Sequence, residues 1–127
     1  MAVEYLHTSD APAAIGPYSQ ATSAGGFLFT AGQIAIDPAT MQVVEGDVSA
    51  QAEMAMKNLA AVLSHAGCGW KDVVKTTIFL TDMGDFAKVN EVYGRWLGDT
   101  KPARSTVAAA GLPKGVRFEV ECIAKLP

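Results

Sequence analysis

The stretch of residues 117–126 constrains the fold more than any other part of the sequence. It reads Arg-Phe-Glu-Val-Glu-Cys-Ile-Ala-Lys-Leu, and its apolar and polar side chains alternate with a period of two. That period is typical of a β-strand with one buried face. The apolar face consists of Phe118, Val120, Cys122 and Ala124. The opposite face carries Glu119 and Glu121, so the pattern predicts two carboxylates on one side of a sheet.

A second strand is predicted for residues 104–109, because Pro102 suits a strand start and a Gly- and Pro-rich turn follows at 111–115. If the two strands pair or lie side by side, Arg104 approaches Glu119. Such a pair has two interpretations. It is either a surface ion pair of little energetic value, or a small-molecule anchor beside a group that handles protons.

Other segments show strand or helix periods. The sequence from Asp47 to Ala66 repeats its apolar residues every three or four positions, which indicates an amphipathic helix. A second helical stripe runs from Phe86 to Leu97, with N-cap candidates at 82–85. Strand patterns occupy the ranges 3–7, 20–23, 27–30, 41–44 and 73–81.

This order predicts an α+β fold in which two helices pack on one face of a mixed six-stranded sheet. We expect the opposite face to carry Thr77, Arg104, Thr106, Glu119 and Glu121, interrupted by apolar residues such as Phe79 and Ile123. That face is too polar for a dry core. It suits a wet barrel formed between subunits.

Composition bounds the function classes. The 127 residues predict a single domain over 1–127, and no apolar run is long enough to span a bilayer. Half of the residues are hydrophobic and the mean hydropathy is +0.19, which favours buried subunit interfaces. The net charge is −3 with scattered basic residues, which argues against a nucleic-acid partner.

The remaining features favour a cytoplasmic protein without cofactors. The N-terminus has no export pattern, and the two cysteines, Cys68 and Cys122, form no disulfide framework. His65 and Cys68 lie close in sequence, but without a third ligand they do not predict a zinc site. Nothing in the sequence requires a metal or an organic cofactor.

Several linked motifs resemble a known family. They are Pro-Ala-Arg-Ser-Thr-Val at 102–107, Leu-Pro-Lys-Gly-Val at 112–116 and Phe-Glu-Val-Glu-Cys-Ile-Ala at 118–124, together with segments 14–20, 30–34, 74–78 and 85–90. In this order they are similar to the RidA/YjgF family of reactive-imine deaminases, over essentially the whole chain. The resemblance implies a chorismate-mutase-like fold that assembles as a homotrimer, with clefts between neighbouring chains.

The resemblance also implies an activity and a site. Family members hydrolyse 2-iminobutanoate and 2-iminopropanoate, released by pyridoxal-phosphate enzymes, to 2-oxo acids and ammonia. By motif, Arg104 grips the substrate carboxylate, and Glu119 acts as base and then proton donor. Tyr18 closes the cleft from a neighbouring chain, while the Gly32 backbone and Asn90 contact the bound acid. Taken as residues alone, Tyr18 could equally pack at the core edge, and Asn90 could be an exposed helix amide.

Two departures from the family pattern bear on substrate range. Thr106 stands where the best-studied members have a cysteine, so roles of that thiol do not transfer. Ala31 stands where a serine is common, which removes another hydroxyl group. Two other functions remain open: a trimer that binds 2-oxo acids without catalysis, and an endoribonuclease or translation inhibitor.

Overall fold

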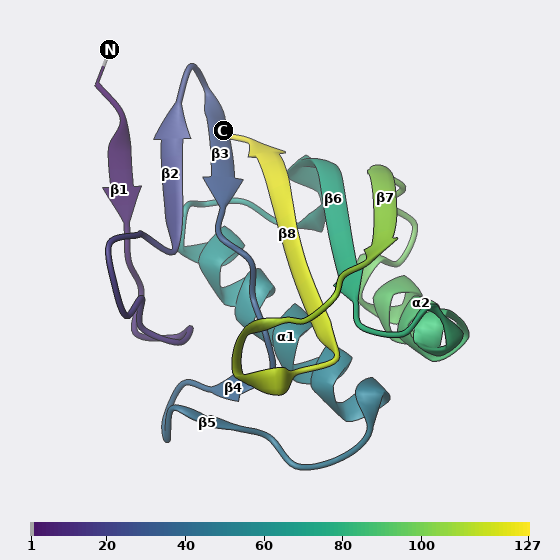
Figure 1. The fold of residues 1–127 in the computed structure, drawn as a ribbon. Helices are drawn as coiled ribbons and strands as arrows, with labels where there is room; N and C mark the ends of the chain where they lie inside the picture. Colours follow the sequence, from purple (N-terminus) through teal and green to yellow (C-terminus); the bar gives the residue numbers. More distant parts are fainter. Residues whose placement is uncertain (1) are drawn as a thin grey trace.

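The protein is described by a computed structural model covering residues 2–127 (Figure 1). A six-stranded sheet has the order β1-β2-β3-β8-β6-β7, and only β6 and β7 run parallel. Its strands are β1 (Glu4–Leu6), β2 (Ala21–Ala24), β3 (Phe27–Thr30), β6 (Val73–Leu80), β7 (Ala103–Ala108) and β8 (Phe118–Lys125).

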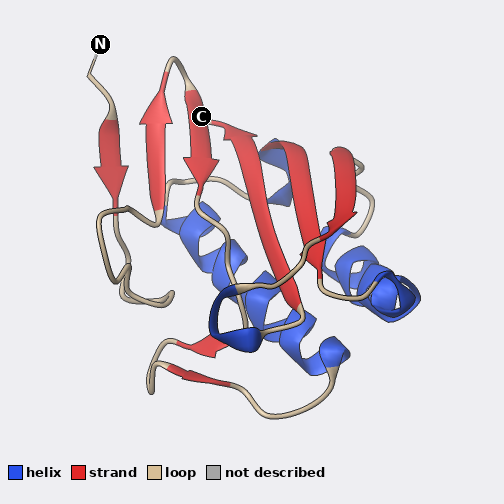
Figure 2. Ribbon diagram, in the orientation of Figure 1, coloured by secondary structure: helices blue, strands red, loops and turns tan. Residues whose placement is uncertain are grey.

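Two helices, α1 (Val48–His65) and α2 (Phe86–Leu97), cover one face of this sheet (Figure 2). The predicted α+β class and the mixed six-stranded sheet are therefore confirmed. One element was not expected. The predicted strand near 41–44 is β5 (Gln42–Val43), and it pairs with β4 (Ile36–Asp37) in a separate two-stranded ribbon.

The sequence explains where these elements begin and turn. The Asp47 side chain accepts a hydrogen bond of 3.1 Å from the backbone N–H of Ala50 and so caps α1. The hairpin between β2 and β3 turns through Gly25 and Gly26, whose φ angles are +59° and +84°. Two successive positive φ angles define the tight turn that matches the twist of paired strands.

A bulge in β6 corrects one predicted face. The alternating pattern of residues 73–81 predicts that Val74 shares a face with Thr76, Ile78 and Leu80. The pairing with β8 shifts register between Val73 and Lys75, so Val73 is buried and Val74 is 44% exposed. An extra residue at such a bulge breaks the alternation of side chains.

The register of β6 shows which side chains share a face. Thr76 pairs with Arg104 in β7 and with Cys122 in β8, so these three side chains point toward the helices. Phe79 pairs with Val107 and Glu119, which point to the open face. Arg104 and, two residues on, Thr106 therefore lie on the helix-covered face. The prediction that both lie on the open face was wrong.

The open face of the sheet is rich in exposed apolar side chains. They are Tyr5 in β1, Phe27 and Phe29 in β3, and Val107 in β7. Exposed apolar side chains on one face make that face a candidate interaction surface. Among residues 2–127, no helix combines the length and the apolar character required to cross a bilayer.

The helix-covered face contains the core, and one buried polar side chain ties α1 to the β4 segment. Asn58 in α1 is 1% exposed. Its amide nitrogen donates hydrogen bonds of 3.1 and 2.8 Å to the carbonyl oxygens of Ile34 and Ile36. This amide therefore satisfies two backbone acceptors in the segment that follows β3.

We predict that Asn58→Leu lowers the free energy of unfolding by about 2–4 kcal/mol, because leucine fills the space but leaves both carbonyls unsatisfied. Denaturant titration measures the change. Lys57→Leu, at the exposed neighbouring position, is the control and should change stability by less than about 0.5 kcal/mol. Equal effects of the two substitutions would contradict the role assigned to Asn58.

Candidate functional site

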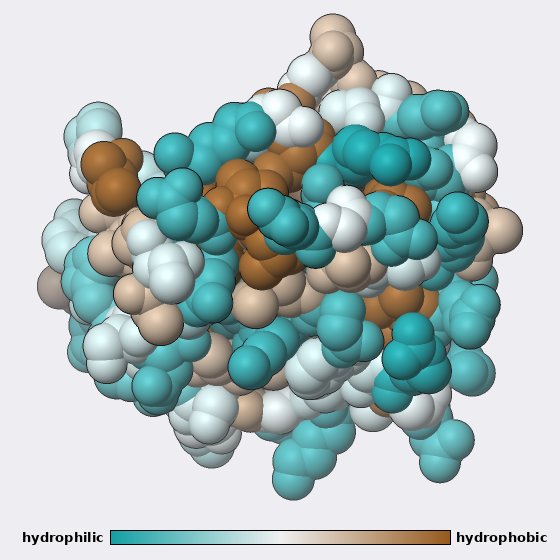
Figure 3. Space-filling model, turned by 90° about the horizontal axis from the view of Figure 1, so that it is seen from below, coloured by the Kyte–Doolittle hydropathy of each residue, from teal (hydrophilic) through white to brown (hydrophobic). Residues whose placement is uncertain are grey.

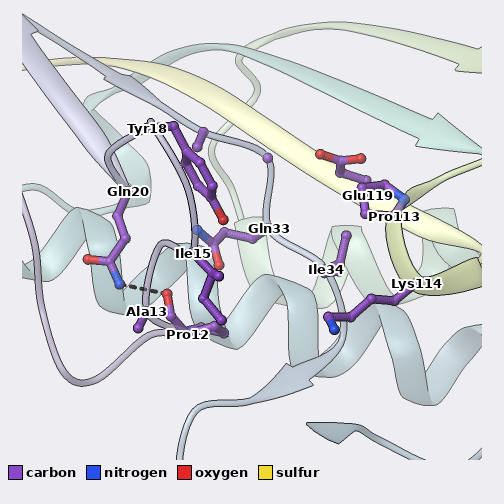
Figure 4. A pocket seen from close by; sticks show the side chains of 12 residues that line it. Pro12, Ala13, Ile15, Tyr18, Gln20, Gln33, Ile34, Pro113, Lys114 and Glu119 are labelled. Carbon is purple, nitrogen blue, oxygen red and sulfur yellow. Dashed lines mark hydrogen bonds between the residues drawn. The ribbon is translucent and has the colours of Figure 1, made fainter. Parts of the chain in front are cut away.

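A cleft of about 680 Å³ opens at the end of the sheet where β3 finishes and β8 begins (Figure 4). Three segments line it: the loop that precedes β2, the residues that follow β3, and the turn that leads into β8. The lining residues are Pro12, Ala13, Ile15, Tyr18, Gln20, Ala31, Gly32, Gln33, Ile34, Pro113, Lys114 and Glu119. We call this space the carboxylate cleft. On the molecular face seen from below, hydrophobic residues gather in a patch above and to the left of the centre, and others lie toward the right (Figure 3).

The loop that carries Tyr18 is held in place by Gln20. This glutamine is 2% exposed, and its amide nitrogen donates hydrogen bonds to the carbonyls of Thr8, Ala11 and Pro12. Its amide oxygen accepts a 2.6 Å hydrogen bond from the Thr8 backbone N–H. The loop is thereby fastened at several points, while Tyr18 itself stays 55% exposed at the cleft.

A register change after β3 brings Gly32 against Glu119. Phe29 pairs with Ile123, but Gln33 pairs with Val120, so the β3 side contains one extra residue. Between these pairs, the Thr30 hydroxyl accepts a 2.9 Å hydrogen bond from the Cys122 backbone N–H.

The backbone of Gly32 packs directly on the Glu119 carboxylate. A Cβ atom at this position would collide with that carboxylate and with the Cγ of the same side chain. Glycine is therefore required by close approach rather than by an unusual φ angle. The predicted contact of the Gly32 backbone with a bound acid stays a prediction, and the side chain that Gly32 touches within the chain is Glu119.

The environment of Glu119 favours its protonated form. Partial burial, and then the negative charge of Glu121 two residues along the same face, raise the pKa of Glu119 above its ordinary value. A carboxyl group that holds its proton to higher pH is suited to exchange protons with a bound molecule.

Arg104 lies in a different cleft of about 400 Å³, between the end of α2 and the start of β7. We call it the arginine cleft; its lining residues are Asn90, Tyr93, Gly94, Leu97, Gly98, Thr100, Lys101, Pro102 and Arg104. The Nη1 of Arg104 donates a 2.7 Å hydrogen bond to the Oδ1 of Asn90. The guanidinium carbon also lies 4.9 Å from the centre of the Tyr93 ring and 5.4 Å from that of Phe86.

No carboxylate neutralises Arg104 within residues 2–127. Arg117 shows the contrast, because its Nη2 donates to both carboxylate oxygens of Asp85 at 2.8 Å. Arg117 is thus used to join β8 to the start of α2. The charge of Arg104 stays available to a ligand.

The structure divides the predicted site residues into two groups. Tyr18, Gly32 and Glu119 line the carboxylate cleft of one chain, whereas Arg104 and Asn90 line the arginine cleft. Because β6 separates β7 from β8, the expected approach of Arg104 to Glu119 within one chain does not occur.

The remaining members of the predicted set follow the same division. Thr106 shares the face of Arg104 and pairs with Ile78 in β6. Tyr18 and Glu119 line the same cleft of one chain, and the predicted closure of a site by Tyr18 of a neighbouring chain stays a prediction. Among residues 2–127, no three His, Cys, Asp or Glu side chains cluster as metal ligands would.

Sequence reasoning missed two residues of these clefts. Gln20 is the last residue of the motif segment 14–20, but only the folded loop shows that its amide binds four backbone groups. Tyr93 was assigned to the apolar stripe of α2. Helical periodicity could not show that the Tyr93 hydroxyl forms a hydrogen bond of 2.7 Å with the Thr76 hydroxyl.

Comparison with known proteins agrees with this architecture. Residues 8–126 match the family described as Endoribonuclease L-PSP. A RutC family protein of Synechocystis is 56% identical, with 100% of this chain and 99% of that protein covered. A 2-iminobutanoate/2-iminopropanoate deaminase of Mus musculus is 46% identical, covering 94% of this chain and 88% of that protein.

A solved structure is similar over the same extent. A protein of the Rid family from Yersinia pestis superposes with a TM-score of 0.96 at 44% identity, covering 98% of this chain and 100% of that chain. The chain therefore belongs to the Endoribonuclease L-PSP family, and the resemblance to RidA/YjgF proteins carried by its motifs is confirmed.

We predict that Gly32→Ala pushes the Glu119 side chain out of the carboxylate cleft and into water. The pKa of Glu119 should then fall toward its ordinary value, and stability should drop by about 1–3 kcal/mol. Carbon-detected NMR titration of the Glu119 carboxyl group measures the pKa.

The matched control for this substitution is Gly69→Ala, because φ is −128° there and no atom lies within 4 Å of the added Cβ. It should leave the Glu119 titration unchanged. A wild-type titration curve in Gly32→Ala would contradict the close packing described above.

We also predict that Glu121→Gln lowers the pKa of Glu119, because the substitution removes the neighbouring negative charge that disfavours ionisation. The same NMR titration tests this. Glu91→Gln, on the exposed side of α2, removes an equal charge and should have no effect on Glu119. A pKa that rises or stays constant in Glu121→Gln would exclude the electrostatic cause.

Proposed function

We propose that this protein hydrolyses 2-imino acids, such as 2-iminobutanoate and 2-iminopropanoate, to 2-oxo acids and ammonia. The observation that carries the proposal is the chemistry of the two clefts. One holds a guanidinium that has no acidic partner among residues 2–127, and the other holds a carboxyl group whose pKa is raised. A 2-imino acid has one group for each: a carboxylate for the cation, and a C=N bond that requires proton transfer during hydrolysis.

The proposed reaction needs few groups. Arg104 binds the substrate carboxylate through two charge-assisted hydrogen bonds, which fix the orientation of the C=N carbon. Glu119, as carboxylate, accepts a proton from water as the water oxygen bonds to that carbon, and it then donates this proton to the imine nitrogen, which completes a carbinolamine. Glu119 next accepts the proton of the carbinolamine hydroxyl and donates it to the amine as the C–N bond breaks, so that ammonia leaves and a 2-oxo acid remains. No step requires a metal or an organic cofactor.

We further propose that the complete site forms between copies of the chain, in a homotrimer. Within one chain, Arg104 and Glu119 lie on opposite faces of the sheet and in different clefts. The exposed apolar side chains of the open face supply a surface that association would cover. A ligand can then meet Arg104 of one copy and the carboxylate cleft of the next.

The other site residues take supporting roles in this proposal. Tyr18 and the Gly32 backbone line the side of the substrate near Glu119, and Asn90 orients the guanidinium by accepting a hydrogen bond from it. Thr106 offers a hydroxyl group on the face of Arg104 but no thiol. The chemistry therefore depends on Arg104 and Glu119, and substrate range depends on residues such as Thr106.

We expect the protein to accelerate imine hydrolysis when 2-iminobutanoate is generated in place by a threonine dehydratase. Timed release of ammonia and of 2-oxobutanoate measures the effect. Arg104→Lys should lower kcat/KM by about 100-fold, because it loses paired hydrogen bonds to a charged group. Glu119→Gln should lower kcat by about 10²- to 10⁴-fold.

A trimer that only binds 2-oxo acids is the main rival function. It predicts tight binding of 2-oxobutanoate with no acceleration by the wild type. Equal rates for wild type and Glu119→Gln would likewise refute the catalytic mechanism. Arg117→Lys is the matched control for Arg104→Lys. The guanidinium of Arg117 is paired with Asp85 in the wild type, so its replacement should leave activity intact.

A mixing experiment tests the shared site. Arg104→Ala and Glu119→Gln chains, each inactive alone, are unfolded together in equal amounts and refolded. In random trimers with sites between neighbours, roughly a quarter of wild-type activity should return, because one of the two mixed interfaces unites an intact Arg104 with an intact Glu119. A mixture that stays inactive after refolding into mixed oligomers would place both groups in one chain.

A further inference from the structure

We propose that Tyr93 is a positioning residue for Arg104, and that its hydroxyl bond to Thr76 fixes the aromatic ring against which the guanidinium rests. This inference rests on the proposed function, in which Arg104 binds the substrate carboxylate. In this role Tyr93 acts through the arginine, and no contact between Tyr93 and the substrate is needed.

The contact between Tyr93 and Thr76 joins a helix to the sheet. Thr76 is completely buried in β6, Tyr93 is 8% exposed in α2, and their hydroxyl oxygens lie 2.7 Å apart. A hydroxyl pair of this length, away from water, holds the phenol ring in one orientation. Thr76 is also the residue that pairs in register with Arg104 in β7. The ring is therefore fastened to the strand beside the arginine it supports.

The ring and its neighbours hold Arg104 without neutralising it. The guanidinium carbon lies 4.9 Å from the Tyr93 ring centre and 5.4 Å from the Phe86 ring centre, within the range of cation–π attraction. The amide of Asn90 occupies one nitrogen of the group. All three partners are uncharged, so an arriving carboxylate meets a full positive charge on an ordered side chain.

Burial further favours the uncharged form of the Tyr93 phenol. Desolvation raises the pKa of Tyr93, although the hydrogen bond with Thr76 and the positive charge of Arg104 both act to lower it. A neutral phenol attracts the guanidinium through its ring while its hydroxyl is engaged elsewhere. Asp85–Arg117, in which a carboxylate holds the cation, shows how this chain fixes an arginine that serves structure alone.

The test separates the ring from the hydroxyl group. Tyr93→Leu removes the ring, so we expect KM for 2-iminobutanoate to rise roughly tenfold with kcat within about twofold of wild type. Tyr93→Phe keeps the ring, and combining it with Thr76→Val avoids an unpaired buried hydroxyl. This double variant should raise KM by about threefold, less than Tyr93→Leu does, because the ring is kept but the bond that fixes it is lost; an unchanged KM would overturn the role of the hydroxyl bond. Should Tyr93→Leu not fold, Tyr93→Met, with a flexible side chain of similar reach, replaces it.

A matched control tests whether general destabilisation of the fold could account for the rise in KM expected for Tyr93→Leu. Val92→Ala deletes buried atoms from the adjacent position of α2 and should lower stability without changing KM. If Tyr93→Leu also leaves KM unchanged, or if Val92→Ala raises KM as much, the positioning role is overturned.

A binding assay keeps this inference distinct from the proposed function. Calorimetry should show that Tyr93→Leu weakens binding of 2-oxobutanoate about tenfold but does not alter binding of 2-oxobutanamide, which lacks the carboxylate. If the wild type binds 2-oxobutanoate without hydrolysing imines, the proposed function fails, and a selective loss of carboxylate binding in Tyr93→Leu still supports the role of Tyr93. Equal loss for both ligands would overturn it.

Discussion

The insertion of β6 between β7 and β8 is the constraint on which the rest of the structure depends. A strand that pairs parallel with β7 and antiparallel with β8 sets the facing of both at once. Thr76 of β6 pairs with Arg104, so the Arg104 side chain points toward the helices. Phe79 of β6 pairs with Glu119, so the Glu119 side chain points to the open face. The site chemistry is therefore separated within one chain by backbone register, before any side chain adopts its rotamer. A composite site between copies is the proposal that this separation favours.

Both charged groups are shaped by what surrounds them. Arg104 rests on two aromatic rings and an amide, which order the cation and leave its charge intact. Glu119 lies half-buried beside Glu121 and against the backbone of Gly32, so its proton is held more tightly. The arrangement suits an anionic molecule that also exchanges a proton. The same chain uses a close Arg117–Asp85 pair where only attachment is needed, which makes the absence of an acid beside Arg104 in residues 2–127 informative.

Much of the fold was predictable because local patterns report burial. The alternation of residues 117–126 became β8, the helical period after Asp47 became α1, and the stripe starting at Phe86 became α2. The errors have a common origin in long-range pairing. Periodicity along one strand cannot show which strand lies beside it, so the expected approach of Arg104 to Glu119 failed. The predicted face of Val74 was wrong for the same reason, because the bulge that exposes Val74 arises from a register shift between β6 and β8.

By itself, the sequence determined the class of fold, the family, and the residue types available for chemistry, because these follow from side-chain periodicity and from motifs contiguous in the chain. Tertiary structure alone decided how those residues are grouped. Tyr18, Gly32 and Glu119 converge on one cleft, and Arg104 joins Asn90 and Tyr93 in another. The physical reason is that grouping depends on strand order, register and the face each side chain takes. Those quantities are set by hydrogen bonds between segments far apart in the chain.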